Sequence, residues 1–270
     1  MREVYSFNTK WAFAKGEQAV PQNIPETWYF VNLPHTWNAI DGQDGGNDFY
    51  RGTCYYAKEV EKIELPENAQ YYLEFQGANS SADVYVNGKK LAHHDGGYST
   101  WRVNMTDAME EKNLIVVAVD NKSNDRVYPQ NADFTFYGGL YRNVNIIAVP
   151  DSHFDLDYCG GPGISVTPEV CGTKAKADIQ VYLTNKKEGQ TLSYLIKDQE
   201  GNLVAELKDT NETKAILEIQ DVHLWNGRKD PYLYTAEACL SENGQVLDSV
   251  STRFGCRTFR IDAEHGFFLN

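Results

Sequence analysis

Paired cysteines are missing from this chain of 270 residues. Its five cysteines, Cys54, Cys159, Cys171, Cys239 and Cys256, are scattered and form no C-x-x-C pair. An odd number at such spacing indicates neither a zinc site nor a disulfide framework in a chain of this size. We therefore expect reduced, buried thiols.

Long apolar runs are also absent. No stretch approaches the roughly 20 apolar residues of a membrane-spanning helix, so the sequence predicts no membrane association. The segment Met1–Tyr5 lacks the charged and apolar regions of a signal peptide. This leaves the compartment open: periplasmic or extracellular if a leader was trimmed away, cytoplasmic otherwise.

Positive charge is scarce, because 25 lysines and arginines face 38 acids and give a net charge of -13. Such a surface repels phosphate backbones, which argues against a nucleic-acid partner. The common catalytic signatures are absent too: there is no G-x-S-x-G elbow, no P-loop and no H-E-x-x-H. The six histidines show no metal-ligand spacing.

Helical periodicity is nearly absent as well, and only 106–112 would make a turn or two. Strand patterns occur instead. Apolar residues alternate at 71–75, and again at 84–86, where the pattern runs into the hairpin signal Asn87-Gly88. The run "LIVVAVD" at 114–120 is short and continuously apolar, which is typical of a strand buried on both faces.

A domain boundary is predicted in the segment 150–168, which contains Gly160-Gly161-Pro162-Gly163, residues that break sheets. After it, roughly six or seven short strands in about 100 residues indicate an immunoglobulin-like β-sandwich. The first half, longer and richer in loops, suits a larger sandwich such as a jelly roll. We therefore predict an all-β chain, with a jelly-roll domain at 1–149 and an immunoglobulin-like domain at 150–262.

Three local clusters of polar and aromatic residues are candidate functional sites. The glycine-rich loop 41–52 carries Asp41, Asp44 and Asp48, but their spacing does not match an EF-hand. It is either an exposed loop or one that reaches a neighbouring site. The stretches "HHDGGYSTW" (93–101) and "LWNGRKDPYLY" (224–234) are better explained as a hairpin and a corner, each packed by aromatic residues.

The stretch "NADFTFYGGLYRNV" (131–144) raises a sharper question, because Asp133 stands at the head of an aromatic run. A buried acid is costly unless something pairs with it. It is either a loop acid held by backbone amides or by an arginine such as Arg142 or Arg51, or a functional group. Gly138-Gly139 would allow a sharp turn or a close approach to another surface.

Taken in order, these segments resemble glycoside hydrolase family 2, and the β-galactosidase branch looks nearest. In the first half, the matching stretches are "VNLPHTWNA" (31–39), "DFYRGTCYY" (48–56), "VYVNGKKLAHHDGGYSTW" (84–101) and "DFTFYGGLYRNV" (133–144). In the second half they are "LWNGRKDPYLYTAEACL" (224–240), "RFGCRTFRID" (253–262) and "GFFLN" (266–270).

The resemblance implies a jelly-roll sugar-binding domain, an immunoglobulin-like domain and then a TIM barrel, with 263–270 as the start of the linker to that barrel. In this family both catalytic glutamates of the retaining mechanism lie on the barrel. No residue here matches them, so we assign no catalytic residue and expect this chain to be inactive by itself. The implied parent is an exo-β-glycosidase, a β-galactosidase in particular, that hydrolyses terminal β-linked sugars in carbohydrate metabolism.

The resemblance also implies substrate-binding residues. In β-galactosidases of this family, the acid that matches Asp133 reaches the active site on the barrel, near a sodium ion and the sugar hydroxyls. The loop that holds Asn47, Asp48 and Tyr50 turns toward the same site. We therefore expect these four residues to contact substrate, and Asp133 to serve as a metal ligand. No cofactor is expected in the chain itself, whereas sodium or magnesium is expected in the longer enzyme.

Two rival functions stay open, a free-standing carbohydrate-binding module and a purely structural pair of sandwiches. Aromatic platforms on an exposed sheet face would favour the module, because sugar rings stack on aromatic rings. Glycan binding by the chain alone would point the same way. The absence of both glycan binding and a barrel partner would favour the scaffold. The sequence does not settle the sugar, the linkage or whether the protein forms a homo-oligomer.

The substitution Asp133→Asn tests the role that the resemblance implies. In the longer enzyme we expect kcat/KM to fall about tenfold or more, equivalent to ~1.4 kcal/mol, because the amide keeps the shape and loses the charge. Steady-state kinetics on an aryl glycoside would measure this. Unchanged kinetics together with a melting temperature many degrees lower would show that the acid is structural.

Overall fold

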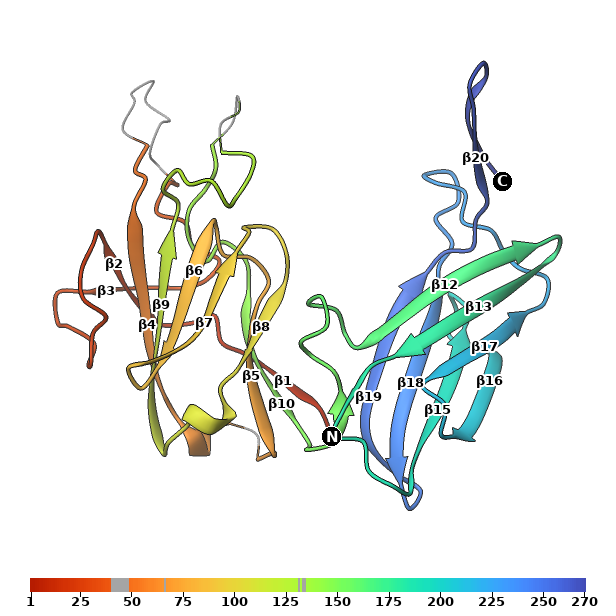
Figure 1. Cartoon of the computed structure of the whole chain (residues 1–270), viewed down its shortest axis with the longest axis horizontal. Helices are drawn as coiled ribbons and strands as arrows, with labels where there is room; N and C mark the ends of the chain where they lie inside the picture. The colour runs from red at the N-terminus through yellow and green to blue at the C-terminus, as the bar shows by residue number, and fades with distance from the viewer. Residues whose placement is uncertain (40–48, 66, 131, 133–134) are drawn as a thin grey trace. The chain divides into compact units, whose positions relative to one another are not determined.

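The computed structural model describes residues 1–39, 49–65, 67–130, 132 and 135–270, and the chain divides into two compact units (Figure 1). The first unit is Glu3–Val149, and the second is Met1–Arg2 together with Pro150–Asn270. Within the described residues, helix is limited to two 3-10 turns, η1 (Lys62–Glu64) and η2 (Thr106–Ala108). The predicted all-β fold class is confirmed. No described helix has the length and apolar character needed to cross a membrane.

The first unit is a jelly-roll sandwich of two antiparallel sheets (Figure 1). The four-stranded sheet has the order β1 (Glu3–Ser6), β10 (Val144–Val149), β5 (Gln70–Phe75), β8 (Trp101–Asn104). The six-stranded sheet has the order β3 (Tyr29–Val31), β2 (Trp11–Lys15), β4 (Thr53–Glu61), β9 (Lys112–Asp120), β6 (Ser81–Val86), β7 (Lys89–Asp95).

Strand β9 shows why this sequence forms a central strand. Ile115, Val117 and Val119 enter the main core between the sheets, whereas Val116 belongs to a smaller apolar cluster that includes Trp28. Side chains along a strand point alternately to its two faces, so β9 contributes apolar side chains to both. The expectation of a strand buried on both faces is confirmed for this part of β9.

The sequence predicts two hairpins in this unit, and the structure contains one of them. Asn87 and Gly88 join β6 to β7 with φ angles of 50° and 78°, the positive values that a tight hairpin turn requires. In the 93–101 stretch, Trp101 stacks on Phe75 at 4.5 Å between ring centroids, and on His94 at 4.6 Å. The tight turn at Asn87-Gly88 and the aromatic packing of Trp101 are confirmed. The hairpin predicted over 93–101 is wrong, because β7 pairs with β6 in the six-stranded sheet whereas β8 pairs with β5 in the four-stranded sheet, so the segment crosses from one sheet to the other.

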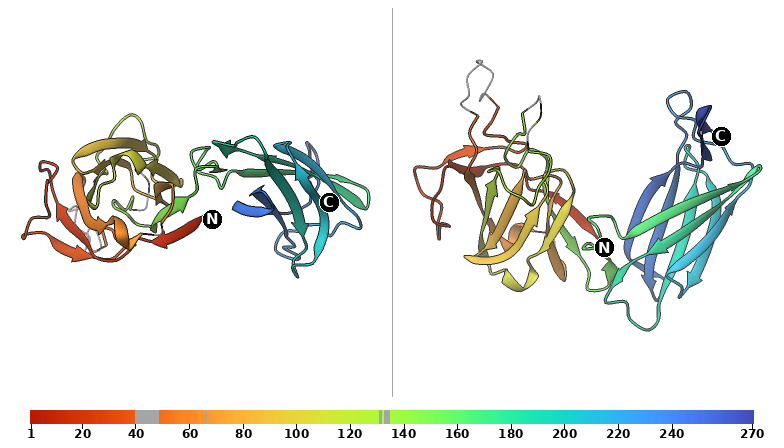
Figure 2. Two further views of the ribbon diagram at one scale, coloured as in Figure 1. Left: turned by 90° about the horizontal axis from the view of Figure 1, so that it is seen from below. Right: turned by 45° about the horizontal axis from the view of Figure 1, so that its top comes forward.

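The second unit is an immunoglobulin-like sandwich, shown from two further sides in Figure 2. One sheet has the order β12 (Ile164–Cys171), β13 (Lys174–Val181), β17 (Lys214–Ile219). The other has the order β16 (Leu203–Thr210), β15 (Gln190–Lys197), β18 (Tyr234–Glu242), β19 (Gln245–Phe254). Two short pairs are added, β11 (His153–Phe154) with β14 (Leu183–Thr184), and β20 (Phe259–Asp262) with β21 (Gly266–Leu269).

Strict alternation builds the core of the second unit. On β15, Leu192, Tyr194 and Ile196 are fully buried while their neighbours in sequence are half-buried. The Tyr194 hydroxyl donates a 2.6 Å hydrogen bond to the Glu212 carbonyl. Burial, with a further contribution from Glu212, raises the pKa of Tyr194 to about 12.

The cysteines correct one expectation. All five are free thiols; Cys54 and Cys256 are buried and Cys239 is half-buried, but Cys159 and Cys171 are exposed. Cys171 ends β12 on an outward position, and Cys159 lies in a turn with a φ of 51°. Burial of the cysteines was predicted from residue type alone. The positions of Cys159 in a turn and of Cys171 at an exposed strand end override that preference.

A buried ion pair ties the N-terminus into the second unit. The Asp248 carboxylate is fully buried and accepts hydrogen bonds from Arg2 Nε (3.2 Å) and Arg2 Nη2 (3.0 Å). It also accepts one from the Phe154 backbone N–H at 2.8 Å. Each Asp248 oxygen therefore has a partner, which a buried carboxylate requires.

Asp248→Asn tests this pair. We expect the free energy of unfolding of the second unit to fall by about 3 kcal/mol or more, because removing one charge leaves the Arg2 guanidinium without its counter-ion. Urea unfolding would measure it. Glu206→Gln is the control, since the Lys208–Glu206 pair is exposed and should contribute less than about 1 kcal/mol. Equal effects of the two substitutions would contradict the assignment.

Candidate functional site

The structure describes one of the four predicted substrate-binding residues. Asn47, Asp48 and Asp133 lie outside the described residues. Tyr50 is described and lies just before β4, half-buried. Its ring lies 4.5 Å from Lys15 Nζ, and burial raises the pKa of its phenol.

A buried pair of asparagines holds the backbone at Tyr50. Asn38 and Asn121 are both buried, and each donates a side-chain N–H to the Tyr50 carbonyl, at 3.1 and 3.2 Å. The Asn121 amide also donates to Asn38 Oδ1 at 3.3 Å, and its own oxygen accepts from Gly52 N at 2.9 Å. The polypeptide on both sides of the 40–48 segment is therefore fixed by the same two side chains.

Gly138-Gly139 brings a second segment to this point. The Gly138 N–H donates to Asn38 Oδ1 at 2.8 Å, and a Cβ on Gly138 would lie 2.2 Å from the Trp37 ring. Gly139 has a φ of +126° and pairs with Asn79 through two backbone hydrogen bonds of 3.1 and 3.2 Å. The predicted close approach is confirmed. The chain that follows 133–134 is thus anchored beside the chain that borders 40–48.

The two arginines considered as partners of Asp133 both donate to backbone carbonyls. Arg51 Nη2 donates to the Gln130 carbonyl at 2.8 Å. Arg142 Nη1 donates to the Tyr98 carbonyl at 2.9 Å and to Gln76 at 3.3 Å. The role of Asp133 therefore stays a prediction.

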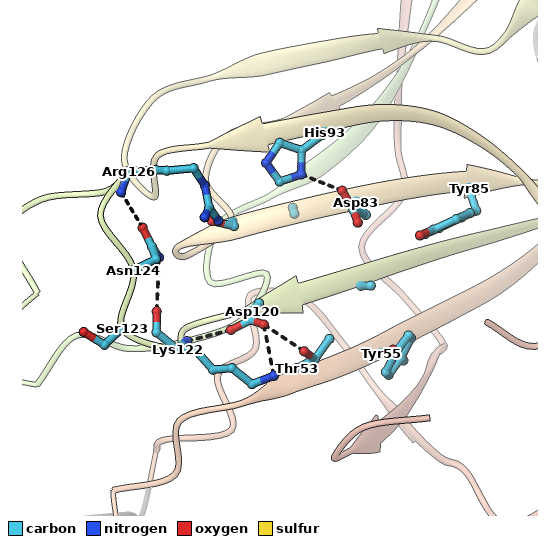
Figure 3. A pocket seen from close by; sticks show the side chains of 13 residues that line it. Thr53, Tyr55, Asp83, Tyr85, His93, Asp120, Lys122, Ser123, Asn124 and Arg126 are labelled. Carbon is cyan, nitrogen blue, oxygen red and sulfur yellow. Dashed lines mark hydrogen bonds and ion pairs between the residues drawn. The ribbon is translucent and has the colours of Figure 1, made fainter. Parts of the chain in front are cut away.

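Beside this anchor, the face of the six-stranded sheet opposite the main core carries a polar basin of about 440 Å³ (Figure 3). Its volume falls within the ~300–1,000 Å³ of small-molecule sites. Two adjacent cross-strand rows form its floor, since the strands are in register. The first row is Thr53, Asp120 and Ser81, with Asp95 next to Ser81 but outside the lining, and the second is Tyr55, Ala118, Asp83 and His93.

Asp120 organises one end of the basin. It ends β9 and accepts hydrogen bonds from Thr53 Oγ1 at 2.8 Å and from the Lys122 backbone N–H at 2.6 Å (Figure 3). The Lys122 ammonium lies 3.6 Å from the same carboxylate and also pairs with Glu17. These contacts hold the segment after β9 against the rim, where Asn124 and Arg126 also line the basin.

His93 organises the other end. Its Nδ1 lies 2.6 Å from Asp83 and its Nε2 3.2 Å from Asp95. The hydrogen bond that His93 donates to Asp83 raises the pKa of His93; burial opposes this, and Asp95 raises the pKa further. Burial opposes ionisation of Asp95, but hydrogen bonds from Ser81, Arg126 and His93 lower its pKa to about 2. At this end, therefore, the carboxylates of Asp83 and Asp95 both contact His93, and Arg126 pairs with Asp95 as well.

The arrangement is suited to binding a polar ligand. Hydrogen-bond donors and acceptors, both acidic and basic, lie around the small side chain of Ala118. The rings of Tyr55 and Tyr85 line the same basin. A molecule with many hydroxyl groups can use both kinds of partner. Among the described residues, no three His, Cys, Asp or Glu side chains are grouped so as to hold a metal ion.

Sequence reasoning did not select this basin. Alternation places Asp83 and Tyr85 on the face opposite Val84 and Val86, which is a usable signal. Alternation does not tell which residue of β9 lies beside Asp83 and Tyr85. The rows of the basin depend on this pairing register between β6 and β9.

The two neighbouring histidines should titrate in opposite directions. We expect His93 to titrate above, and His94 below, the ordinary value of about 6.5, since carboxylates raise the pKa of His93 and burial lowers that of His94. NMR titration of both imidazoles would measure this. Asp83→Asn should lower the midpoint of His93 and leave His94 as the internal control.

The ion pair between His93 and Asp83 should also make the stability of the first unit depend on pH, in a direction that the raised pKa of His93 fixes. The pKa of His93 is raised on folding, so its contribution is present below about pH 6.5 and is lost as pH rises through the folded value. Because the pair is largely exposed, we expect less than about 1 kcal/mol. A His93 midpoint at or below that of His94 would contradict the described ion pairs.

Two family models match the chain, in order. The glycosyl hydrolases family 2 sugar binding domain matches residues 40–150, and the glycosyl hydrolases family 2 model matches residues 162–257.

Named relatives agree with this result. The chain is 35% identical over 253 residues to a β-glucuronidase from Bacteroides fragilis, covering 89% of this chain and 36% of the relative. It is 32% identical to a putative β-glucuronidase from Formosa agariphila, covering all of this chain and 34% of that protein. The chain thus spans about a third of the length of these curated relatives.

Solved structures have the same fold over the whole chain. An FMN-binding β-glucuronidase from Facaelibacterium prausnitzii L2-6 has a TM-score of 0.90 at 38% identity, and the chain covers 42% of it. A putative β-galactosidase from Bacteroides fragilis has a TM-score of 0.89 at 36% identity, with 43% of that chain covered. The chain therefore belongs to glycosyl hydrolases family 2, and it comprises the sugar-binding and immunoglobulin-like domains of that family.

Proposed function

We propose that these two domains are the accessory N-terminal part of a retaining exo-β-glycosidase that removes terminal β-linked glucuronic acid. The ordered match of both family-2 domain models carries the proposal. The lengths of the relatives support a further catalytic domain, because the chain covers only 36% and 34% of the two curated relatives described above. The catalytic carboxylates would lie on that domain, on a TIM barrel.

The sugar is the finer part of the proposal. Five of eight curated relatives are named β-glucuronidases, two of them as putative. A β-galactosidase, the branch of the family that the sequence motifs resemble, is the second candidate. The Bacteroides fragilis structure named as a putative β-galactosidase supports it.

The loop anchor describes what the first domain would contribute. Asn38 fixes both the carbonyl of Tyr50 and the N–H of Gly138, so one side chain holds described residues close in sequence to each of the two segments that carry predicted site residues. We propose that Asp133, Asn47, Asp48 and Tyr50 reach the substrate from there. A carboxylate such as Asp133 is a ligand that sodium or magnesium accepts, and that assignment rests on the resemblance alone.

The polar basin favours one further role, glycan binding by the sugar-binding domain itself. Its mixed donors and acceptors and its two tyrosines suit a sugar ring. This role is compatible with an accessory domain and with a free-standing binding module. Binding of a methyl glycoside to the chain alone, lost in Asp83→Ala, would support it.

Glycosidase activity should be absent from the 270-residue chain and present in the longer protein. We expect the 270-residue chain to release no nitrophenol from 4-nitrophenyl β-D-glucuronide or β-D-galactoside, and the longer protein to hydrolyse the glucuronide with the higher kcat/KM. A colorimetric assay of both proteins on both substrates would measure it. A mock purification from the same host controls for contaminating enzyme.

Turnover by the pure 270-residue chain would overturn the accessory role. A higher kcat/KM on the galactoside would move the assignment to the second candidate, and turnover of neither substrate by the longer protein would contradict both.

A further inference from the structure

A second cavity, of about 410 Å³, lies in the first unit among residues of β1, β3 and β4. Strands β1 and β3 are edge strands of the two sheets. Tyr5 and Phe30 line the cavity and are 43% and 66% exposed, so aromatic rings are accessible there. Lys58 of β4 lines it too, and its side chain is half-buried.

The Lys58 ammonium has few polar partners. Its Nζ donates one hydrogen bond, to the Thr9 carbonyl at 2.7 Å, and lies 3.9 Å from the ring centroid of Phe7 and 6.0 Å from that of Trp11. An ammonium has three N–H donors. Within the described part of the chain, the Thr9 carbonyl is the only hydrogen-bond acceptor of this group. The hydrogen bonds that the Lys58 ammonium loses with water on folding are therefore only partly replaced by bonds within the protein.

The charges around Lys58 do not make up that loss. Burial lowers the pKa of Lys58 to about 8; Glu64 opposes this and Lys10 adds to it. Glu59 also lines the cavity. At pH 7 an amine of pKa ~8 is roughly 10% neutral, whereas an ordinary lysine of pKa ~10.4 is less than about 0.1% neutral. The neutral form is the nucleophile.

We propose that Lys58 is a modification site, the most reactive lysine of this chain toward activated carbonyl compounds such as acyl phosphates and aryl esters. The cavity gives the electrophile room in front of Nζ, and the exposed rings of Tyr5 and Phe30 offer apolar contact for its organic part. The inference is independent of any glycosidase activity.

The reaction is an acyl transfer. The Lys58 nitrogen lone pair attacks the carbonyl carbon and forms the C–N bond. The bond from that carbon to the phosphate or phenolate oxygen then breaks, and the nitrogen loses its proton to solvent. The products are an amide on Lys58 and free phosphate or phenol, with no oxidant or reductant involved.

The product would fit the same surroundings. An amide nitrogen keeps one N–H for the Thr9 carbonyl, while the positive charge over the Phe7 ring disappears. Acylation removes a cation–π donor in this way. The neutral acyl group would extend into the cavity rather than into the core, because Phe7 and Trp11 occupy the core side.

The experiment measures every lysine of the unmodified 270-residue chain at once. The chain is treated at pH 7 with limiting acetyl phosphate, and in parallel with 4-nitrophenyl acetate, and acylation is followed by peptide mass spectrometry. Lys112, with a side chain 83% exposed, is the reference. The larger neutral fraction outweighs the lower intrinsic nucleophilicity of a weaker base, so we expect Lys58 to react at least about fivefold faster than Lys112.

The pH profile separates this inference from simple accessibility. The Lys58 rate should level off above about pH 8, whereas the Lys112 rate should keep rising through pH 9. Lys10→Gln should slow Lys58 at pH 7, since it removes a cation that lowers its pKa. A Lys58 rate no faster than that of Lys112, or one that rises in parallel with it through pH 9, overturns the proposal.

Discussion

The register of β9 between β4 and β6 is the constraint on which the first domain depends. Its alternation sends Val117 and Val119 into the core and leaves Ala118 and Asp120 on the basin face. A shift of one residue would exchange these faces, burying a carboxylate and exposing valines. Core and basin are therefore two results of a single pairing, and neither can be altered alone.

A second dependence joins the loops to that sheet. Asn121 follows β9 directly and, with Asn38, satisfies the carbonyl of Tyr50 in a buried position. Buried polar groups need such partners, and here the two partners lie 83 residues apart in the chain. Asn38 also accepts a hydrogen bond from the Gly138 N–H. Because Gly138 has no Cβ, its backbone can lie against Trp37. Family-2 loops near a substrate would need a rigid base of this kind.

Burial and pairing compete at each charged group of this domain. His93 has two carboxylate partners, and its pKa rises; His94 is stacked beneath Trp101, and its pKa falls. Lys58 is buried against Phe7 with one carbonyl acceptor, so its pKa falls as well. Residue type does not distinguish these outcomes. The number of partners that remain after water is lost decides them.

The sequence by itself determined the all-β class, the Asn87-Gly88 turn, the central strand at 114–120 and the family, because local alternation and turn chemistry are written in neighbouring residues. Only the tertiary structure decided which residues of separate strands meet. The rows through Asp120 and His93 and the half-burial of Lys58 depend on pairings between residues dozens of positions apart. Alternation has a period of two residues and says nothing about such long-range register, which packing of the whole sheet selects.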